Sequence, residues 1–99
     1  MIKMEYDKEK NVLTCQFDGK MDMAASQTAS AQFEQAWGAA QSRASIVFDM
    51  AAVTFVASAF LRICLQAAKL AGTEHFKMTN TSPAVQKILQ IAGMEQFTY

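Results

Sequence analysis

The chain has 99 residues, of which 52% are hydrophobic and only 18% are charged. This length favours one domain with one modest core. The low share of charge indicates that some apolar surface is covered by helices or by a partner. Lys and Arg balance Asp and Glu at nine each, so no net field attracts nucleic acid or an anionic membrane, and we expect no nucleic-acid partner.

The chain opens with two strands joined by a polar hairpin loop over 7–11. Apolar residues alternate with polar ones on both sides of this loop, which is strand periodicity. The apolar positions are Ile2, Met4 and Tyr6 before the loop, and Leu13, Cys15 and Phe17 after it. This parity points Cys15 inward, and we expect Asp18-Gly19 to end the second strand.

Three helices are expected, near 23–40, 58–71 and 83–92. Asp22 is placed to cap the first of them, whose apolar positions fall at helical spacing. These positions are Ala29, Phe33, Ala36, Trp37 and Ala40. Pro83 stands at a first-turn position of the third helix, and glycines follow the second and third helices as stops.

Short strands are expected between the helices. The continuous apolar run 46–48 is typical of a strand buried on both faces, and 75–78 is a second candidate. Because strand and helix alternate three times after the hairpin, we predict one α/β domain over 1–99. Its sheet is mixed and mostly parallel, with an N-terminal antiparallel hairpin and flanking helices.

Two features bear on localisation. Residues 1–10 are charged and have no signal-peptide core, and the apolar stretch 50–61 is shorter than the roughly 20 residues a membrane span needs. We therefore expect a cytoplasmic protein that does not insert directly into a membrane.

No motif for catalysis or metal binding is present in the sequence. His75 is the only histidine, and the sequence fixes no nucleophile or orienting carboxylate beside it. Cys15 and Cys64 lack a metal-type spacing and are interpreted as reduced, buried thiols. Asp22 and Asp49 are interpreted as a cap and a turn residue, although strand ends in α/β sheets also hold functional sites. We expect no enzyme, no metal site and no cofactor.

The second helix carries more apolar surface than one buried face requires. Its strongly polar residues, Arg62, Gln66 and Lys69, form one narrow stripe, so neighbouring helices or a partner must cover the rest. Ser58 is placed to cap this helix, where a phosphate would meet the positive end of the helix dipole. Any capping serine fits that description, so the chemistry alone favours a structural role.

Four stretches together resemble the STAS domain of anti-sigma-factor antagonists: 19–22, 46–49, 53–56 and 80–97. The last is the most specific, because an Asn there precedes a short helix that ends in Gly plus a large apolar residue. Its matching residues are Asn80, Ser82, Pro83, Val85, Leu89, Gly93 and Met94. The resemblance covers nearly the whole chain. It implies a mixed sheet flanked by helices, and protein partners such as anti-sigma serine kinases.

The resemblance also implies a switch serine at the start of the second main helix, and here the chain departs from the family. The family pattern reads aspartate, two serines, glycine and leucine, whereas this chain reads Ala57, Ser58, Ala59, Phe60 and Leu61. Ser58 matches the first serine, but Ala59 replaces the serine that is usually phosphorylated. We therefore expect the usual switch to be absent, and keep Ser58 as the alternative acceptor.

These patterns predict a partner-binding surface around the start of the second helix, formed by Asp22, Ala57, Ser58, Ala59, Phe60 and Arg62. Within it, Phe60 is either an exposed anchor or a core residue. The predicted function is a small regulatory module that docks a bacterial signalling protein, such as an anti-sigma factor or serine kinase. The alternative is an accessory subunit that binds the ATPase of a lipid-transport ABC system. A homodimer and a small ligand are left open.

Overall fold

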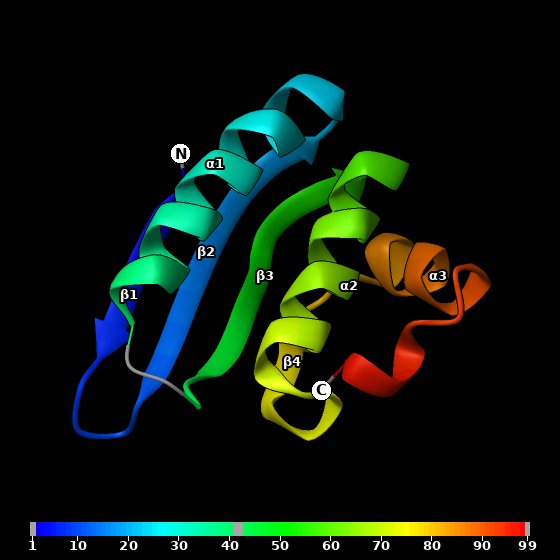
Figure 1. The fold of residues 1–99 in the computed structure, drawn as a ribbon. Helices are drawn as coiled ribbons and strands as arrows, with labels where there is room; N and C mark the ends of the chain where they lie inside the picture. Colours follow the sequence, from blue (N-terminus) through cyan, green and yellow to red (C-terminus); the bar gives the residue numbers. More distant parts are fainter. Residues whose placement is uncertain (1, 41–42, 99) are drawn as a thin grey trace.

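A four-stranded sheet organises the computed structural model, which describes residues 2–40 and 43–98 (Figure 1). Its strands are β1 (Lys3–Asp7), β2 (Val12–Met21), β3 (Ser45–Val56) and β4 (Phe76–Thr79), in the spatial order β1-β2-β3-β4. β1 pairs antiparallel with β2, whereas the β2–β3 and β3–β4 pairs are parallel. The predicted mixed, mostly parallel sheet with an opening antiparallel hairpin is confirmed.

Three helices follow the parallel strands, close to their expected bounds. They are α1 (Met23–Ala39), α2 (Ser58–Ala71) and α3 (Pro83–Ile91), and two short 3₁₀ turns, η1 (Thr73–His75) and η2 (Glu95–Phe97), complete the chain. α1 and α2 lie side by side across one face of the sheet, and α3 packs against β3 beyond α2 (Figure 1). None of these helices is long and apolar enough to cross a membrane within the described part of the chain.

The core lies between the sheet and these helices. The residues that alternate inward from β2, β3 and β4 are all buried: Leu13, Cys15, Phe17, Ile46, Phe48, Met50, Phe76 and Met78. Phe48 is the central side chain, because its ring makes edge-to-face contacts with Phe17, Phe33 and Phe76 at centroid distances of 4.9, 5.8 and 5.0 Å. The expected inward position of Cys15 is confirmed.

The opposite face of the sheet is open, which corrects the prediction that 46–48 is buried on both faces. Val47 is partly exposed, and no described side chain on this face of the four strands is buried. α1 and α2 cover the same side of the sheet, so β3 has a helix layer on one side only. A continuous apolar run therefore did not distinguish a strand buried on both faces of the sheet from a strand buried on one face.

The two central strands extend further than the sequence indicated, which corrects two expected ends. β2 continues through Asp18 and Gly19 to Met21, and β3 continues past Phe48 to Val56. Backbone pairing between the two strands persists to their last residues. The extra length carries both strands to the end of the sheet where α1 and α2 begin.

Bulges in β3 explain why its second half was not recognised as a strand. Relative to β2, β3 has one extra residue between Asp49 and Ala52 and another between Val53 and Phe55. A bulge interrupts the alternation of inward and outward side chains. From Met50 onward the buried residues of β3 recur at every third position, a spacing that is not typical of a strand.

Candidate protein-docking surface

The two connections that leave the sheet for α1 and α2 lie side by side. Met21 and Val56, the last residues of β2 and β3, are paired, and the Ala57 N–H donates to the Met21 carbonyl at 2.9 Å. Asp22 follows Met21 and Ser58 follows Ala57, so the starts of α1 and α2 meet at one end of the molecule. This is the carboxyl end of the parallel strands, where α/β sheets commonly carry their sites.

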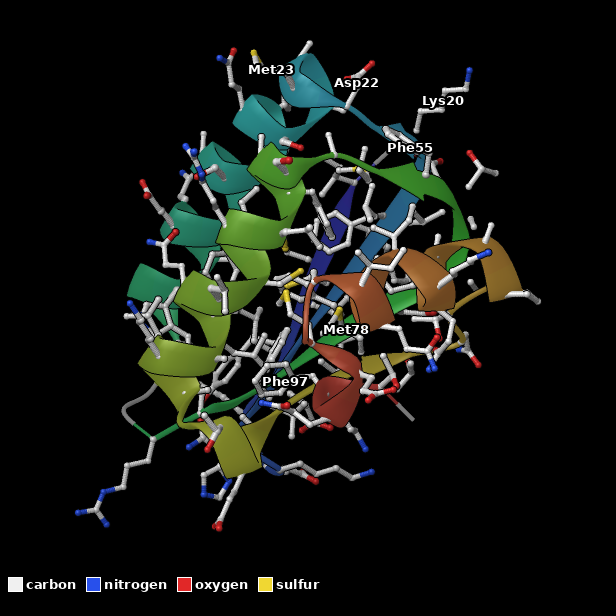
Figure 2. The ribbon with its side chains drawn as sticks, turned by 90° about the vertical axis from the view of Figure 1, so that its right-hand side faces the viewer. Lys20, Asp22, Met23, Phe55, Met78 and Phe97 are labelled. Atoms are coloured by element: carbon white, nitrogen blue, oxygen red, sulfur yellow. The ribbon has the colours of Figure 1, made fainter. Side chains whose placement is uncertain are left out.

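Large apolar side chains are exposed at this end. Met23 is 67% exposed and Phe55 is 43% exposed. Lys20 is the cross-strand partner of Phe55, and Asp22 precedes Met23. Figure 2 shows these four labelled side chains projecting from the same end of the molecule. Together with Ala57 and Ser58 they form what we call the junction surface.

The structure places most of the predicted partner-binding residues on or beside this surface. Asp22 and Ser58 are exposed and belong to it, and Arg62 is exposed one turn further along α2. Ala57 and Ala59 are half-buried. The Asp22 carboxylate accepts a hydrogen bond from the Ala25 N–H at 2.9 Å, so the predicted cap of α1 is confirmed.

Phe60 is a core residue and not an exposed anchor, which decides between the two roles left open for it and removes it from the predicted partner-binding surface. Its side chain is 0% exposed, with ring centroids 5.0 Å from Phe17 and 6.0 Å from Phe48. Phe60 heads the buried stripe of α2, which continues at helical spacing through Ile63, Cys64, Ala67 and Ala68. Phe60 therefore belongs to the buried face of α2, whereas Leu65 and Leu70 remain 47% and 43% exposed on the same helix.

Ser58 does not cap α2, which corrects a second prediction. Ala57 occupies the cap position and offers no side-chain oxygen, and Ser58 is the first helical residue. The N–H groups of Phe60 and Leu61 instead bond to the Ala57 carbonyl, at 3.0 and 3.1 Å. The Ser58 side chain is thus left exposed to solvent.

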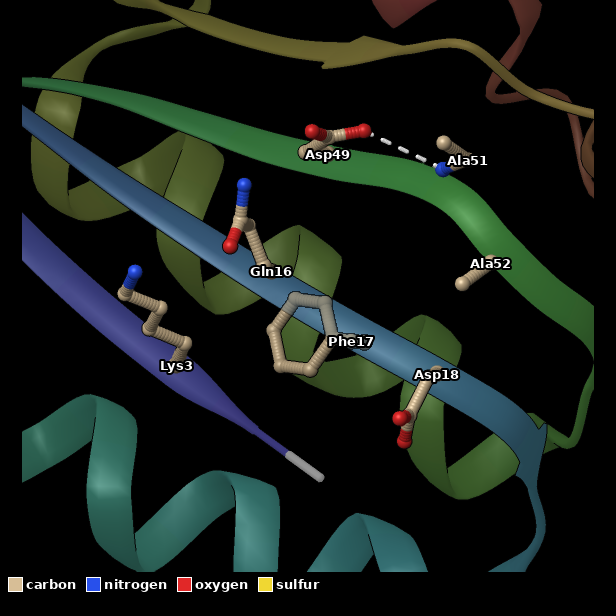
Figure 3. Close-up of a pocket in the computed structure, with 7 residues that line it drawn as sticks. All are labelled: Lys3, Gln16, Phe17, Asp18, Asp49, Ala51 and Ala52. Carbon is tan, nitrogen blue, oxygen red and sulfur yellow. Dashed lines mark hydrogen bonds between the residues drawn. The ribbon is translucent and has the colours of Figure 1, made fainter.

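Asp49 lies within β3 rather than at its end, and its hydrogen bonds indicate a structural role. Its Oδ1 accepts from the Ala51 N–H at 3.1 Å and from the Asn80 side-chain amide at 3.2 Å, which ties β3 to the segment after β4. Asp49 also lines a shallow depression on the open face of the sheet (Figure 3). His75 is exposed in η1, and no group of His, Cys, Asp or Glu in 2–40 and 43–98 is arranged to hold a metal ion.

The two cysteines are buried and free. Burial raises the pKa of the Cys15 thiol to about 12 and also raises the pKa of the Cys64 thiol. The Cys64 thiol lies 3.8 Å from the Met78 sulfur. Because only a thiolate is an effective nucleophile or metal ligand, both side chains act as core residues.

Lys20, Met23 and Phe55 are exposed here although the sequence did not predict them as partner-binding residues. Lys20 and Phe55 lie beyond the positions where β2 and β3 were expected to end, and Met23 was assigned only to the start of a helix. A signal was present for two of them, because the resemblance rests in part on the stretches 19–22 and 53–56, which contain Lys20 and Phe55. If Val56 points inward on a strand, the preceding Phe55 points outward. This could not be inferred while the strand was expected to end near Phe48.

Comparisons with known proteins agree with this architecture. The sequence profile of the STAS domain matches residues 3–98. The anti-sigma factor antagonist SpoIIAA in its unphosphorylated form superposes with a TM-score of 0.80 at 18% identity, over 100% of this chain and 86% of SpoIIAA. The Bacillus cell fate determinant SpoIIAA in its phosphorylated form gives 0.71 at 17% identity, over 100% of this chain and 89% of the other.

A third structure has the same fold. An anti-sigma-factor antagonist (STAS) domain protein from Planctomyces limnophilus gives a TM-score of 0.77 at 16% identity, over 99% of this chain and 87% of its own. No curated protein sequence matches the chain. At these identities the structural likeness establishes the fold, and the profile match over nearly every residue establishes the family. The chain belongs to the STAS domain family.

Proposed function

We propose that this STAS domain is a regulatory protein-binding module that docks a partner through the junction surface, without a phosphorylation switch at the usual serine. The observation that carries the proposal is the exposure of Met23 and Phe55 where α1 and α2 begin. Apolar side chains gain about 25 cal/mol for each Å² removed from water. A partner that covers both side chains would be stabilised by this free energy of burial.

The surroundings of these two side chains suit a protein partner. Lys20 and Asp22 are exposed beside the apolar pair, and Arg62 is exposed one turn along α2. An apolar centre with a polar rim is the usual anatomy of a protein interface. The partner surface would offer an apolar pocket or side chain, with an acidic group facing Lys20 or Arg62. Since SpoIIAA is an anti-sigma factor antagonist, an anti-sigma factor or its kinase is the partner class we propose.

The chemistry of residues 57–60 supports binding that is not switched by phosphate. Ala59 stands where the family resemblance places the acceptor serine, and a methyl group accepts no phosphate. Ala57 removes the acidic residue of the pattern, and Phe60 is committed to the core. Binding would then be governed by the amounts of the two proteins rather than by covalent modification.

A matched pair of truncations tests the proposal. Phe55 and Leu70 are each 43% exposed, but Leu70 lies near the far end of α2. Wild-type protein, Phe55→Ala and Leu70→Ala are used to capture partners from native lysate with quantitative mass spectrometry, and affinities are measured by calorimetry. Phe55→Ala should weaken binding by about 2 kcal/mol, roughly 30-fold, whereas Leu70→Ala should bind normally.

The outcome separates the candidate roles. A partner that binds both variants as tightly as the wild type would overturn the proposed surface. Loss of binding in Leu70→Ala alone would move the interface to the other end of α2. An ABC transporter ATPase among the Phe55-dependent partners would support the accessory-subunit role in place of the signalling role.

A further inference from the structure

The two edges of the sheet differ in how they are protected. The outer edge of β4 is bridged by Thr98, which pairs in parallel with Met78. β1 is the outermost strand on the other side, and no strand of residues 2–40 or 43–98 pairs with its free edge. An unpaired strand edge is a template for a strand of another chain.

The helix beside this edge has an unusual surface. Ten of the seventeen residues of α1 are exposed, yet Glu34 is its only charged residue. About a quarter to a third of an ordinary protein surface is charged. A helix face that lacks ionised side chains is easily dehydrated, and this lowers the cost of covering it with protein.

Shallow depressions follow the seam between β1 and α1. One is lined by Ile2, by Asp18 and Met21 of β2, and by Ala25 and Thr28 of α1. The second is lined by Met4 and Ala36. Gln32 lines both, so the two form a nearly continuous, mostly uncharged strip along the edge of the molecule. The second depression lies beside β1 and would be covered together with its free edge, whereas the first extends past the start of β1 toward the start of α1.

The outward side chains of β1 have opposite charges. Lys3 and Glu5 project onto the open face of the sheet, 63% and 62% exposed, with the Lys3 amine 2.9 Å from the Glu5 carboxylate. Ile2, Met4 and Tyr6 alternate with them and pack toward α1 as half-buried residues. The strand thus presents charge on one side of the sheet and apolar surface on the other.

We propose that this edge is a homodimer interface, in which two copies pair their β1 strands in antiparallel orientation. The two-fold axis passes between the two Met4 residues, which face each other. Lys3 then lies opposite Glu5 of the second copy, and the same pair repeats on the other side of the axis. Opposite charges in directly facing positions stabilise such a ladder. The two sheets join into one of eight strands, with both α1 helices on the same side.

Alternative registers are disfavoured. Moving the axis to Glu5 places two carboxylates directly opposite each other, which is destabilising. A slip by one residue turns Lys3 and Glu5 against the apolar side of the partner strand. The register centred on Met4 places each charged residue opposite one of opposite charge and each apolar residue opposite an apolar residue. Two copies of this chain are sufficient to form it.

The dimer would leave the proposed docking surface free. Lys3 is paired with Gln16, halfway along β2, and β1 runs from there toward the amino end of β2. The junction surface lies at the opposite, carboxyl end. A dimer would carry two junction surfaces, so this inference is independent of the identity of the partner.

Charge reversal provides the test. Lys3→Glu and Glu5→Lys each place like charges opposite each other at both ends of the strand pair, so each should weaken the dimer at least about tenfold. Sedimentation velocity and light scattering from micromolar to millimolar protein should give twice the 10.9 kDa mass for the wild type and mainly monomer for each variant. The double reversal should restore the dimer.

An equimolar mixture of the two single variants is the decisive arm. Each variant carries an unfavourable pair within its own strand, but across the interface every charge faces its opposite, so the mixture should form a heterodimer. Circular dichroism checks that each variant stays folded, as expected for exposed positions. A wild type that stays monomeric, a dimer unaffected by both single reversals, or a mixture that does not associate would overturn the proposal.

Discussion

Replacing Phe60 by Ala tests the central packing argument. The side chain is 0% exposed and its ring contacts Phe17 on β2 and Phe48 on β3. Truncating a buried Phe costs about 3–5 kcal/mol. Each aromatic pair contributes about 0.5–1.5 kcal/mol beyond the area buried. Since two such pairs are lost, we expect about 4–5 kcal/mol.

That loss is large relative to the stability of a domain this size, which is about 5–15 kcal/mol. For a domain of 60–100 residues, each kcal/mol lowers Tm by about 4–8 °C. Phe60→Ala should therefore melt at least 15 °C below the wild type. Thermal and urea unfolding followed by circular dichroism give the free energies. Phe60→Leu, which retains part of the volume, supplies a measurable variant if the alanine protein does not fold.

Phe55→Ala is the matched control, because it deletes the same atoms from a side chain that is 43% exposed. We expect it to lose less than about 1 kcal/mol, in the range of surface substitutions. If Phe60→Ala melted within a few degrees of wild type, or if Phe55→Ala were equally destabilised, the assignment of one ring to the core and the other to the surface would be wrong.

Three further predictions concern the helix cap, the switch position and the thiols. Asp22→Ala removes the acceptor for the Ala25 N–H and should cost about 1 kcal/mol in urea unfolding, whereas Asp22→Asn should retain most of it. Incubation with a STAS-directed serine kinase should leave the protein unmodified by tandem mass spectrometry, and stoichiometric phosphate on Ser58 would contradict this. Cys15 and Cys64 should resist a thiol reagent at pH 8 in native protein and react in urea. The raised pKa of Cys15, about 12 against 9.0, adds stability that is present below pH 9 and is lost as pH rises from 9 toward 12.

The sequence was sufficient for the fold wherever local patterns were regular. The alternation through Leu13, Cys15 and Phe17 placed β2 and its buried face correctly. The cap at Asp22 and the first-turn position of Pro83 located the starts of α1 and α3. In these segments the local propensity, the capping residues and the hydrophobic period all predict the same secondary structure, so the sequence alone was sufficient.

The candidate site was harder to predict, because it depends on irregular structure. The bulges of β3 shift the inward period and bring Phe55 to the surface. Whether Phe60 is a core residue depends on how α2 is rotated about its axis, and a helix apolar on most sides leaves that rotation undetermined. The exposure of Met23 likewise depends on packing of α1 against the sheet. Residue types suggested the region, but only tertiary contacts decided which side chains a partner can reach.

The substitutions at the switch position agree with one another physically. Phe60 fills the space beneath the first turn of α2 and joins Phe17 and Phe48, while the Ala57 N–H holds the connection to β2. Both contacts fix the start of α2 against the sheet. A surface held rigid before binding loses less conformational entropy when a partner docks. Ala59 in place of a serine and the buried ring of Phe60 are therefore both consistent with the preorganised, unswitched docking surface that we propose.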